Sequence, residues 1–126
     1  MSSLTITIKG LDETIKYFDV LGNKKLPSVL RAGLAKSSTF VLGRLNNNTP
    51  VDTGRLKSSN KKIVGTTNAL IGPDSSIAPY ATWVEHGHHT RSGSWVPGQF
   101  FIRRTAIEST SGVQEIFNGL IKLALQ

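Results

Sequence analysis

The residues of this chain that most directly suggest chemistry are three histidines, His86, His88 and His89, in the stretch HGHH. Imidazole is the commonest protein ligand for transition metals, and His86 and His88 would point to the same side of an extended segment. The sequence has no cysteine and no second histidine cluster, and Glu85 is the nearest carboxylate. A structural zinc site almost always needs four ligands. The sequence therefore favours a histidine-containing loop without a resident metal ion.

The Asp-Thr-Gly triplet at 52–54 is the second stretch with a chemical precedent, because aspartic proteases use the same three residues. Their chemistry needs two such carboxylates that share a proton, and this sequence carries the triplet once, before a basic segment. A G-x-S-x-G nucleophile turn and the two glycine-rich phosphate-binding patterns are also missing from the sequence. We therefore expect a protein that is not an enzyme and binds no cofactor.

The triplet lies in TPVDTGRLKSS, a stretch that joins an apolar-periodic segment to a β-like one. Pro50 stops a helix, and Asp52 or Thr53 can accept hydrogen bonds from the free backbone N–H groups of a following turn. Gly54 allows a sharp bend, and Arg55 lies within reach of Asp52. We expect a rigid structural corner formed by Pro50, Asp52, Thr53, Gly54 and Arg55.

Hydrophobic periodicity indicates which elements lie before this corner. Residues 4–9 alternate between apolar and polar types, which predicts a strand with one buried face. A short helix is expected over 12–22, with Asp12 as its N-cap. Apolar residues then recur at helical spacing over 27–47, and the run NNNTP ends that helix.

Three more segments follow the corner. The segments 61–75 and 78–87 are rich in β-branched and aromatic residues and predict two strands joined by a Gly-Pro-Asp turn. Residues 88–99 have no period and predict a loop. A helix is expected over 100–126, which the small residues at 109–112 can kink or split.

This order of strand, helix, helix, strand, strand and helix predicts an α+β fold, in which a small antiparallel sheet carries helices packed on one face. The length of 126 residues predicts a single domain over 1–126, with a flexible loop at 88–99. Hydrophobic residues make up 38% of the chain, so we expect a modest core whose burial is completed by contacts between subunits.

The chain is basic, with a formal net charge of +7 and a pI of about 10.1. Lysine and arginine are spread along the sequence, which fits either a solvated surface or a surface that attracts polyanions and acidic proteins. The N-terminus lacks the pattern of a signal peptide, and no apolar run approaches the roughly 20 residues that span a bilayer. We expect a soluble, cytosolic protein.

Three blocks of the sequence together resemble the neck or tail-completion proteins of long-tailed bacteriophages, the minor tail protein Z-like family of head-tail joining. The blocks are TPVDTGRLKSS (49–59), APYATWVEHG (78–87) and PGQFFIRRTA (97–106). The family carries T-P-V-D-T-G-x-L-x-x-S, Y-A-x-x-V-E-x-G and a Q-x-F-x-x-P-A-like opening of the last helix in the same order. This chain departs from the family at Thr105, where proline is frequent, and in HGHHTRSGSW, which replaces a shorter loop.

The resemblance implies a non-enzymatic structural protein of the virion that acts at the head-tail junction after assembly in the host cytoplasm. It implies a homo-oligomeric ring, with a hexamer as the expected case. The implied partners are a head-closure or adaptor protein, a tail terminator or tail tube protein, and the genomic DNA that passes through the channel, with no membrane. A closed ring joins one patch of each subunit to a different patch of its neighbour.

Within this interpretation, a strand edge that faces a neighbouring subunit is formed by Tyr80, Trp83, Val84 and Glu85, and the loop from 88 to 99 is a docking arm. Trp95 is either a core anchor or an interface anchor, and the interface is the favoured alternative. The residues expected at a subunit or partner interface are Tyr80, Trp83, Glu85, Trp95, Gln99 and Phe100.

A small basic nucleic-acid-binding module is the alternative function. Aromatic residues near basic ones could stack on bases, and the candidates are Tyr80, Trp83, Trp95, Phe100 and Phe101. The sequence shows no helix-turn-helix, zinc-finger or ribonucleoprotein aromatic motif that would strengthen this alternative.

Overall fold

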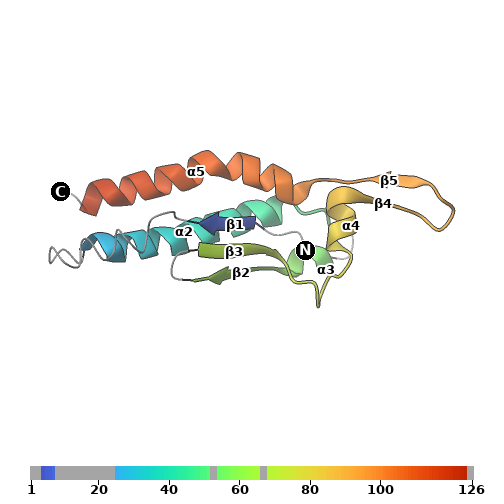
Figure 1. Cartoon of the computed structure of the whole chain (residues 1–126), viewed down its shortest axis with the longest axis horizontal. Helices are drawn as coiled ribbons and strands as arrows, with labels where there is room; N and C mark the ends of the chain where they lie inside the picture. The colour runs from blue at the N-terminus through green and yellow to red at the C-terminus, as the bar shows by residue number, and fades with distance from the viewer. Residues whose placement is uncertain (1–3, 8–24, 52–53, 66–67, 125–126) are drawn as a thin grey trace.

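The computed structural model describes residues 4–7, 25–51, 54–65 and 68–124, and it confirms the predicted mixed α+β fold (Figure 1). The short helix expected over 12–22 lies outside the described residues. The described elements are, in chain order, β1 (Leu4–Thr7), α2 (Lys25–Asn48), α3 (Arg55–Ser58), β2 (Asn60–Val64), β3 (Asn68–Pro73), α4 (Ala81–His86), β4 (Gly87–His89), β5 (Trp95–Pro97) and α5 (Phe101–Ala124).

Three strands form the main sheet in the order β1-β3-β2, and both pairings are antiparallel. Leu4 pairs with Ile71 on one side of β3, and Lys62 pairs with the same Ile71 on the other side. Helix α2 packs against β2 and β3, and α5 lies along α2 (Figure 1). Helix α2 thus covers the sheet, and α5 packs on α2.

Helix α2 buries one stripe of side chains, as its sequence predicts. Leu30, Leu34, Val41 and Leu45 are all buried, at spacings of about one or two helical turns. The helix ends where the Thr49 N–H and hydroxyl groups both donate to the Leu45 carbonyl, at 2.9 and 2.6 Å. The predicted helix over 27–47 is thus confirmed, with one or two more residues at each end.

Two glycines let α2 and α5 approach each other closely. Gly112 of α5 lies against the Phe40 ring, where a Cβ atom would come within 2.5 Å of ring carbon Cζ. Gly33 of α2 lies against the Phe117 ring in the same way, at 2.6 Å from Cε1. Helix α5 runs unbroken from Phe101 to Ala124, so the prediction that 109–112 can kink or split the helix is wrong. Of these residues, Gly112 makes room for the Phe40 ring.

The segment 78–87 is a correction to the sequence prediction, because it forms helix α4 and not a strand. Its burial follows helical spacing: Ala81 and Glu85 are buried, while Trp83 is exposed between them. The Val84 N–H donates to the Tyr80 carbonyl at 3.2 Å, which is the helical hydrogen bond. The first predicted strand, 61–75, contains both β2 and β3, which pair antiparallel, and the Gly65 N–H donates to the Asn68 carbonyl at 2.7 Å. The predicted Gly-Pro-Asp turn at 72–74 therefore lies at the end of β3 and does not join two strands.

The segment 88–99 is a second correction, because most of it is a hairpin. Strands β4 and β5 pair antiparallel, with His89 opposite Trp95 and Gly87 opposite Pro97. We call residues 87–97 the arm. The arm extends beyond the ends of both long helices, as Figure 1 shows.

Asp74, directly after β3, gives the fold a pH-dependent contact. The Lys61 ammonium donates to Asp74 Oδ2 at 2.8 Å, and the Ser76 hydroxyl and N–H donate to Oδ1 at 2.6 and 2.9 Å. These bonds, that from Lys61 above all, hold the pKa of Asp74 well below its usual range. The carboxylate therefore stabilises the fold above its unfolded pKa of about 3.9, and this contribution is lost as the pH falls further.

Replacing Asp74 with asparagine is therefore expected to lower the stability of the protein at pH 7, and to lower it by progressively less as the pH falls from 4 toward 2. Urea denaturation of both proteins at a series of pH values measures the difference. A difference that stayed constant between neutral and acidic pH would contradict the assignment.

Candidate interaction site at the arm end

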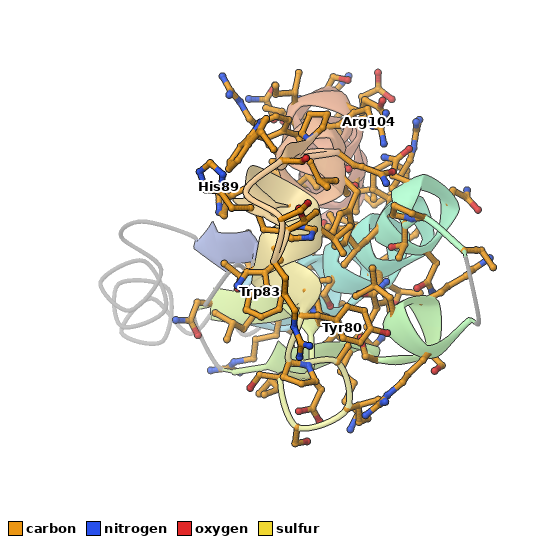
Figure 2. All side chains as sticks on the ribbon, turned by 90° about the vertical axis from the view of Figure 1, so that its right-hand side faces the viewer. Tyr80, Trp83, His89 and Arg104 are labelled. Carbon is orange, nitrogen blue, oxygen red and sulfur yellow. The ribbon has the colours of Figure 1, made fainter. Side chains whose placement is uncertain are left out.

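The three blocks that are separated in the sequence meet at one end of the molecule, which we call the arm end. The Arg55 guanidinium Nε donates to the Ile77 carbonyl at 2.6 Å and so joins the corner to the segment before α4. The Gln99 N–H donates to the Val84 carbonyl at 2.8 Å, which joins the third block to α4. Figure 2 looks onto this end, with Tyr80, which directly precedes α4, and Trp83 of α4 in view.

Glu85 is the central residue of the arm end. It is 2% exposed, and its carboxylate accepts hydrogen bonds from the N–H groups of Ile102 at 2.7 Å and Arg103 at 3.1 Å. Those N–H groups lie in the first turn of α5 and have no acceptor within the helix. A negative charge there also interacts favourably with the helix dipole. Glu85 is therefore an N-terminal cap for α5, and its predicted place on an exposed strand edge is wrong.

The base of the arm is held by close backbone contacts. Gly87 has a φ of 88°, and a Cβ atom there would lie 2.6 Å from the Val96 carbonyl oxygen. Gly98 lies against the Glu85 carbonyl oxygen, where a Cβ atom could not fit. The Phe100 N–H donates to the Glu85 carbonyl at 3.1 Å. Both strands of the arm are thus held in place at its base, where the arm joins α4 and the start of α5.

Each of the three histidines packs against an aromatic ring. The ring centroids of His88 and Trp83 are 5.8 Å apart and stacked, those of His89 and Trp95 are 4.9 Å apart, and those of His86 and Phe100 are 6.4 Å apart. Within the described part of the chain, no group of three or more histidine and acidic side chains is placed to hold a metal ion. The histidines orient the aromatic side chains of the arm end.

A cleft of about 570 Å³ lies between the structural corner and α4. Its walls are largely apolar, with Val51 exposed at 65% and Leu56 buried. Asp52 and Thr53 lie outside the described residues, so a contact between Asp52 and Arg55 stays a prediction. The residues that line the cleft are Pro50, Val51, Gly54, Arg55, Leu56, Tyr80, Val84 and Gln99.

The cleft brings together much of the predicted corner and part of the predicted interface. Gly54 has a φ of 83° and precedes α3, as expected for a sharp bend. Pro50 and Arg55 of the corner line the cleft together with Tyr80 and Gln99 of the predicted interface set. Part of the interface set thus shares one surface with the corner.

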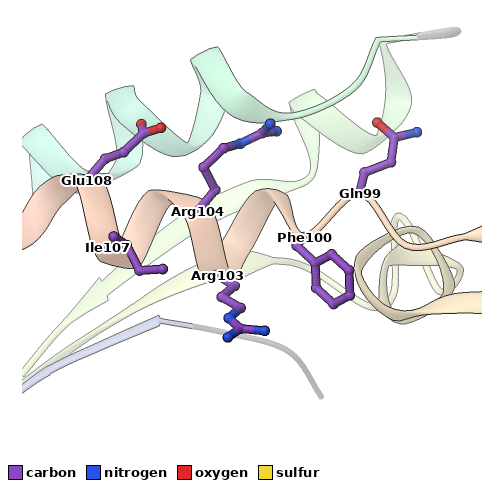
Figure 3. Close-up of a pocket in the computed structure, with 6 residues that line it drawn as sticks. All are labelled: Gln99, Phe100, Arg103, Arg104, Ile107 and Glu108. Atoms are coloured by element: carbon purple, nitrogen blue, oxygen red, sulfur yellow. The ribbon is translucent and has the colours of Figure 1, made fainter.

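A second hollow, of about 360 Å³, lies on the first turns of α5 (Figure 3). Arg104 and Glu108 extend from α5 toward α2, where the guanidinium of Arg104 donates to the Asn48 carbonyl at 3.4 Å. Phe100 and Arg103 lie on the other side of the helix, with the Arg103 guanidinium 6.0 Å from the ring centroid. Gln99 lines both this hollow and the cleft.

The remaining predicted interface residues differ in exposure. Trp83 is exposed at 61%, Trp95 at 55% and Phe100 at 41%, whereas Tyr80 is half-buried beside the cleft. Trp95 is therefore not a core anchor within its own subunit. Its role as an interface anchor stays a prediction.

Sequence reasoning missed Asn60, which joins the sheet to the end of α2. Its amide nitrogen Nδ2 donates to Thr49 Oγ1 at 2.9 Å and to Asn46 Oδ1 at 3.0 Å. These partners lie 11 and 14 positions away in the chain. No local pattern in the sequence marks a contact at that separation.

Comparisons of this chain with protein-family models, with curated proteins and with solved structures found no match. Within the described ranges, no helix combines the length and the apolar character that crossing a bilayer requires. The function is therefore inferred from the geometry of the arm end and from the three sequence blocks that form it.

Proposed function

We propose that this chain is a structural subunit of the head-tail junction of a long-tailed bacteriophage, of the neck or tail-completion kind. The observation that carries the proposal is the convergence of 49–59, 78–87 and 97–106 at the arm end. These are the blocks that resemble the phage family. Residues from all three line one cleft, which supports a shared role for them.

The proposed subunit assembles into a ring, with six copies as the expected number. Exposed apolar side chains gather at the arm end, and Trp83, Trp95 and Val96 of this set belong to the arm or to its base. Exposed patches of this kind are typical of protein interfaces. The ring would contact a head-closure or adaptor protein on one side and a tail terminator or tail tube protein on the other, and DNA would pass through it.

A non-enzymatic role agrees with the use of the ionisable side chains at the arm end. The Glu85 carboxylate is occupied as a helix cap, and the imidazole rings pack on aromatic neighbours. Groups held in this way give the arm end a fixed shape, which is what a docking subunit needs.

The proposal predicts that the purified protein forms a multimer, either alone or on a template. Light scattering at physiological salt should give a mass near six times 13.7 kDa for the protein alone, or stoichiometric capture on purified tail tubes or head connectors. A protein that stayed at 13.7 kDa and ignored both templates would contradict the proposal.

The nucleic-acid-binding alternative is favoured by one observation, the three exposed aromatic residues Trp83, Trp95 and Phe100, of which Phe100 lies beside the Arg103 guanidinium. Phe101 is fully buried and cannot stack on a base. Binding of single- and double-stranded DNA of several lengths at physiological salt separates the two functions. Tight binding supports the alternative, whereas binding with a micromolar or weaker Kd is what incidental charge produces.

A further inference from the structure

We propose that the arm of one copy of this chain packs into the cleft of the next copy, with Trp95 as the anchor. This inference rests on the proposed function, because it names the interface through which the ring subunits would join. The arm means residues 87–97, and the cleft is the one between the structural corner and α4.

The arm lacks the burial that a hairpin of its size needs. Its two strands have three residues each, and all three residues of β5 are exposed. A two-stranded hairpin on its own is at best marginally stable in water. Packing of one face of the arm against another surface would supply the missing burial.

Contacts within its own chain fix the position of the Trp95 side chain before any partner binds. Its ring lies over Gly87, where a Cβ atom would come within 2.7 Å of ring carbon Cζ2, and it meets the His89 ring edge-on. More than half of the side chain still faces solvent. A tryptophan fixed before binding loses little further conformational entropy on binding, which favours its use as an anchor.

The cleft has the size and the chemistry to receive this face of the arm. Its volume of about 570 Å³ lies within the range of about 300 to 1,000 Å³ that is usual for binding pockets. Pro50, Val51 and Val84 give it apolar walls, and the Gln99 side chain supplies a polar group beside them. An indole ring matches this combination, because it has an apolar body and one N–H donor.

Charge favours a second copy over a polyanion as the occupant. The arm carries one charged side chain, Arg91, and the described lining of the cleft also carries one, Arg55. Neither surface concentrates the positive charge that a nucleic acid or a strongly acidic protein selects. The arginine pair Arg103 and Arg104 lies on the α5 hollow, outside both surfaces.

The two surfaces also satisfy the symmetry of a ring. Arm and cleft belong to the same chain and share no residue, so each copy can offer its arm to one neighbour and its cleft to another. Such a heterologous contact closes into a ring or continues as a filament. Because each copy has a net charge of +7, raising the salt concentration should strengthen this association, whereas it would weaken binding to a polyanion.

Cross-linking tests the contact directly, since the natural chain has no cysteine. One variant carries Ser94→Cys next to the anchor, and another carries Val51→Cys in the cleft. The two variants are mixed and allowed to exchange subunits, and a short bis-maleimide linker is then added. Covalent dimers should form in this mixture, and far fewer should form with either variant alone. Adding Trp95→Ala to the Ser94→Cys chain should reduce the yield at least tenfold. Adding Ile63→Ala, which removes an exposed apolar side chain of β2 outside both surfaces, should leave the yield unchanged.

A complementation experiment separates the failure of this inference from the failure of the proposed function. Trp95→Ala keeps the cleft, and Val51→Lys keeps the arm, so each should be monomeric alone while a mixture gives dimers of twice 13.7 kDa by light scattering. Circular dichroism confirms that both variants fold. A wild-type multimer whose mass survived both substitutions would overturn the inference and leave the ring proposal standing. A wild-type monomer without cross-links, even with tail tubes or head connectors present, would overturn both.

Discussion

Replacing Glu85 with alanine is expected to lower the free energy of unfolding by about 2 to 4 kcal/mol, because hydrogen bonds to a charged group contribute about 1.5 to 3 kcal/mol each and are not fully additive. The substitution leaves the N–H groups of Ile102 and Arg103 without their acceptors at a buried helix end. It also removes the negative charge that interacts with the dipole of α5.

Urea denaturation followed by circular dichroism measures this effect, with Glu115→Ala as the matched control. Glu115 is an acidic residue on the exposed surface of α5, so its loss should change stability by less than about 0.5 kcal/mol. The stability of the Glu85→Gln protein should fall between those of the Glu85→Ala and Glu115→Ala proteins. One side-chain oxygen of the glutamine can still accept a hydrogen bond, while its amide NH₂ group faces an N–H donor. A Glu85→Ala protein as stable as the Glu115→Ala protein would show that the cap contributes nothing.

Gly112→Ala is expected to destabilise the protein even though alanine is the better helix former. The new methyl group would come within 2.5 to 2.6 Å of the Phe40 ring, so the ring or the helix must shift. Overpacking of this kind costs about 1 to 3 kcal/mol, whereas the gain in helix propensity is about 1 kcal/mol. Thermal unfolding should therefore show a lower Tm for Gly112→Ala than for the wild type.

Gly119→Ala on the same helix is the matched control, because no heavy atom lies within 4 Å of the position that its Cβ would take. Its Tm should rise, in line with helix propensity alone. Combining Gly112→Ala with Phe40→Leu tests the mechanism, since the smaller side chain should recover part of the loss through a favourable coupling. If Gly112→Ala raised the Tm as much as Gly119→Ala does, the close packing of α2 and α5 at this point would be wrong.

The long helices and strand β1 could be predicted from the sequence, and most of the other short elements could not. Helices α2 and α5 carry apolar stripes over 24 residues each, long enough for the helical period to be unmistakable. Helix α4 has six residues, and its tryptophan and valine, together with the preceding Tyr80, suggest a strand. Its helical form depends on tertiary contacts, above all those of Glu85. The arm strands have three residues each, which is too few for an alternating pattern to be recognised.

The candidate site was predictable in its residues and unpredictable in its arrangement. The sequence singled out Pro50, Gly54 and Arg55 as a corner, and Tyr80 and Gln99 as interface residues. It could not show that they share one cleft, because the hydrogen bond from Arg55 to Ile77 spans 22 positions. Glu85 was assigned to the exterior for the same reason: its partners in α5 lie 17 and 18 positions further along the chain.

The closed base of the arm determines how the subunit would carry a mechanical load. A pull on the tip at residues 90–94 becomes tension in both strands of the arm. This tension reaches α4 through β4 and α5 through β5. The hydrogen bonds from the Gln99 N–H to the Val84 carbonyl and from the Phe100 N–H to the Glu85 carbonyl join the segment after β5 to α4. The two strands of the arm are therefore held together at its base. The force then ends in α5, which lies along α2 for most of the length of the body (Figure 1). Tension at the arm is thereby passed on to the helix pair.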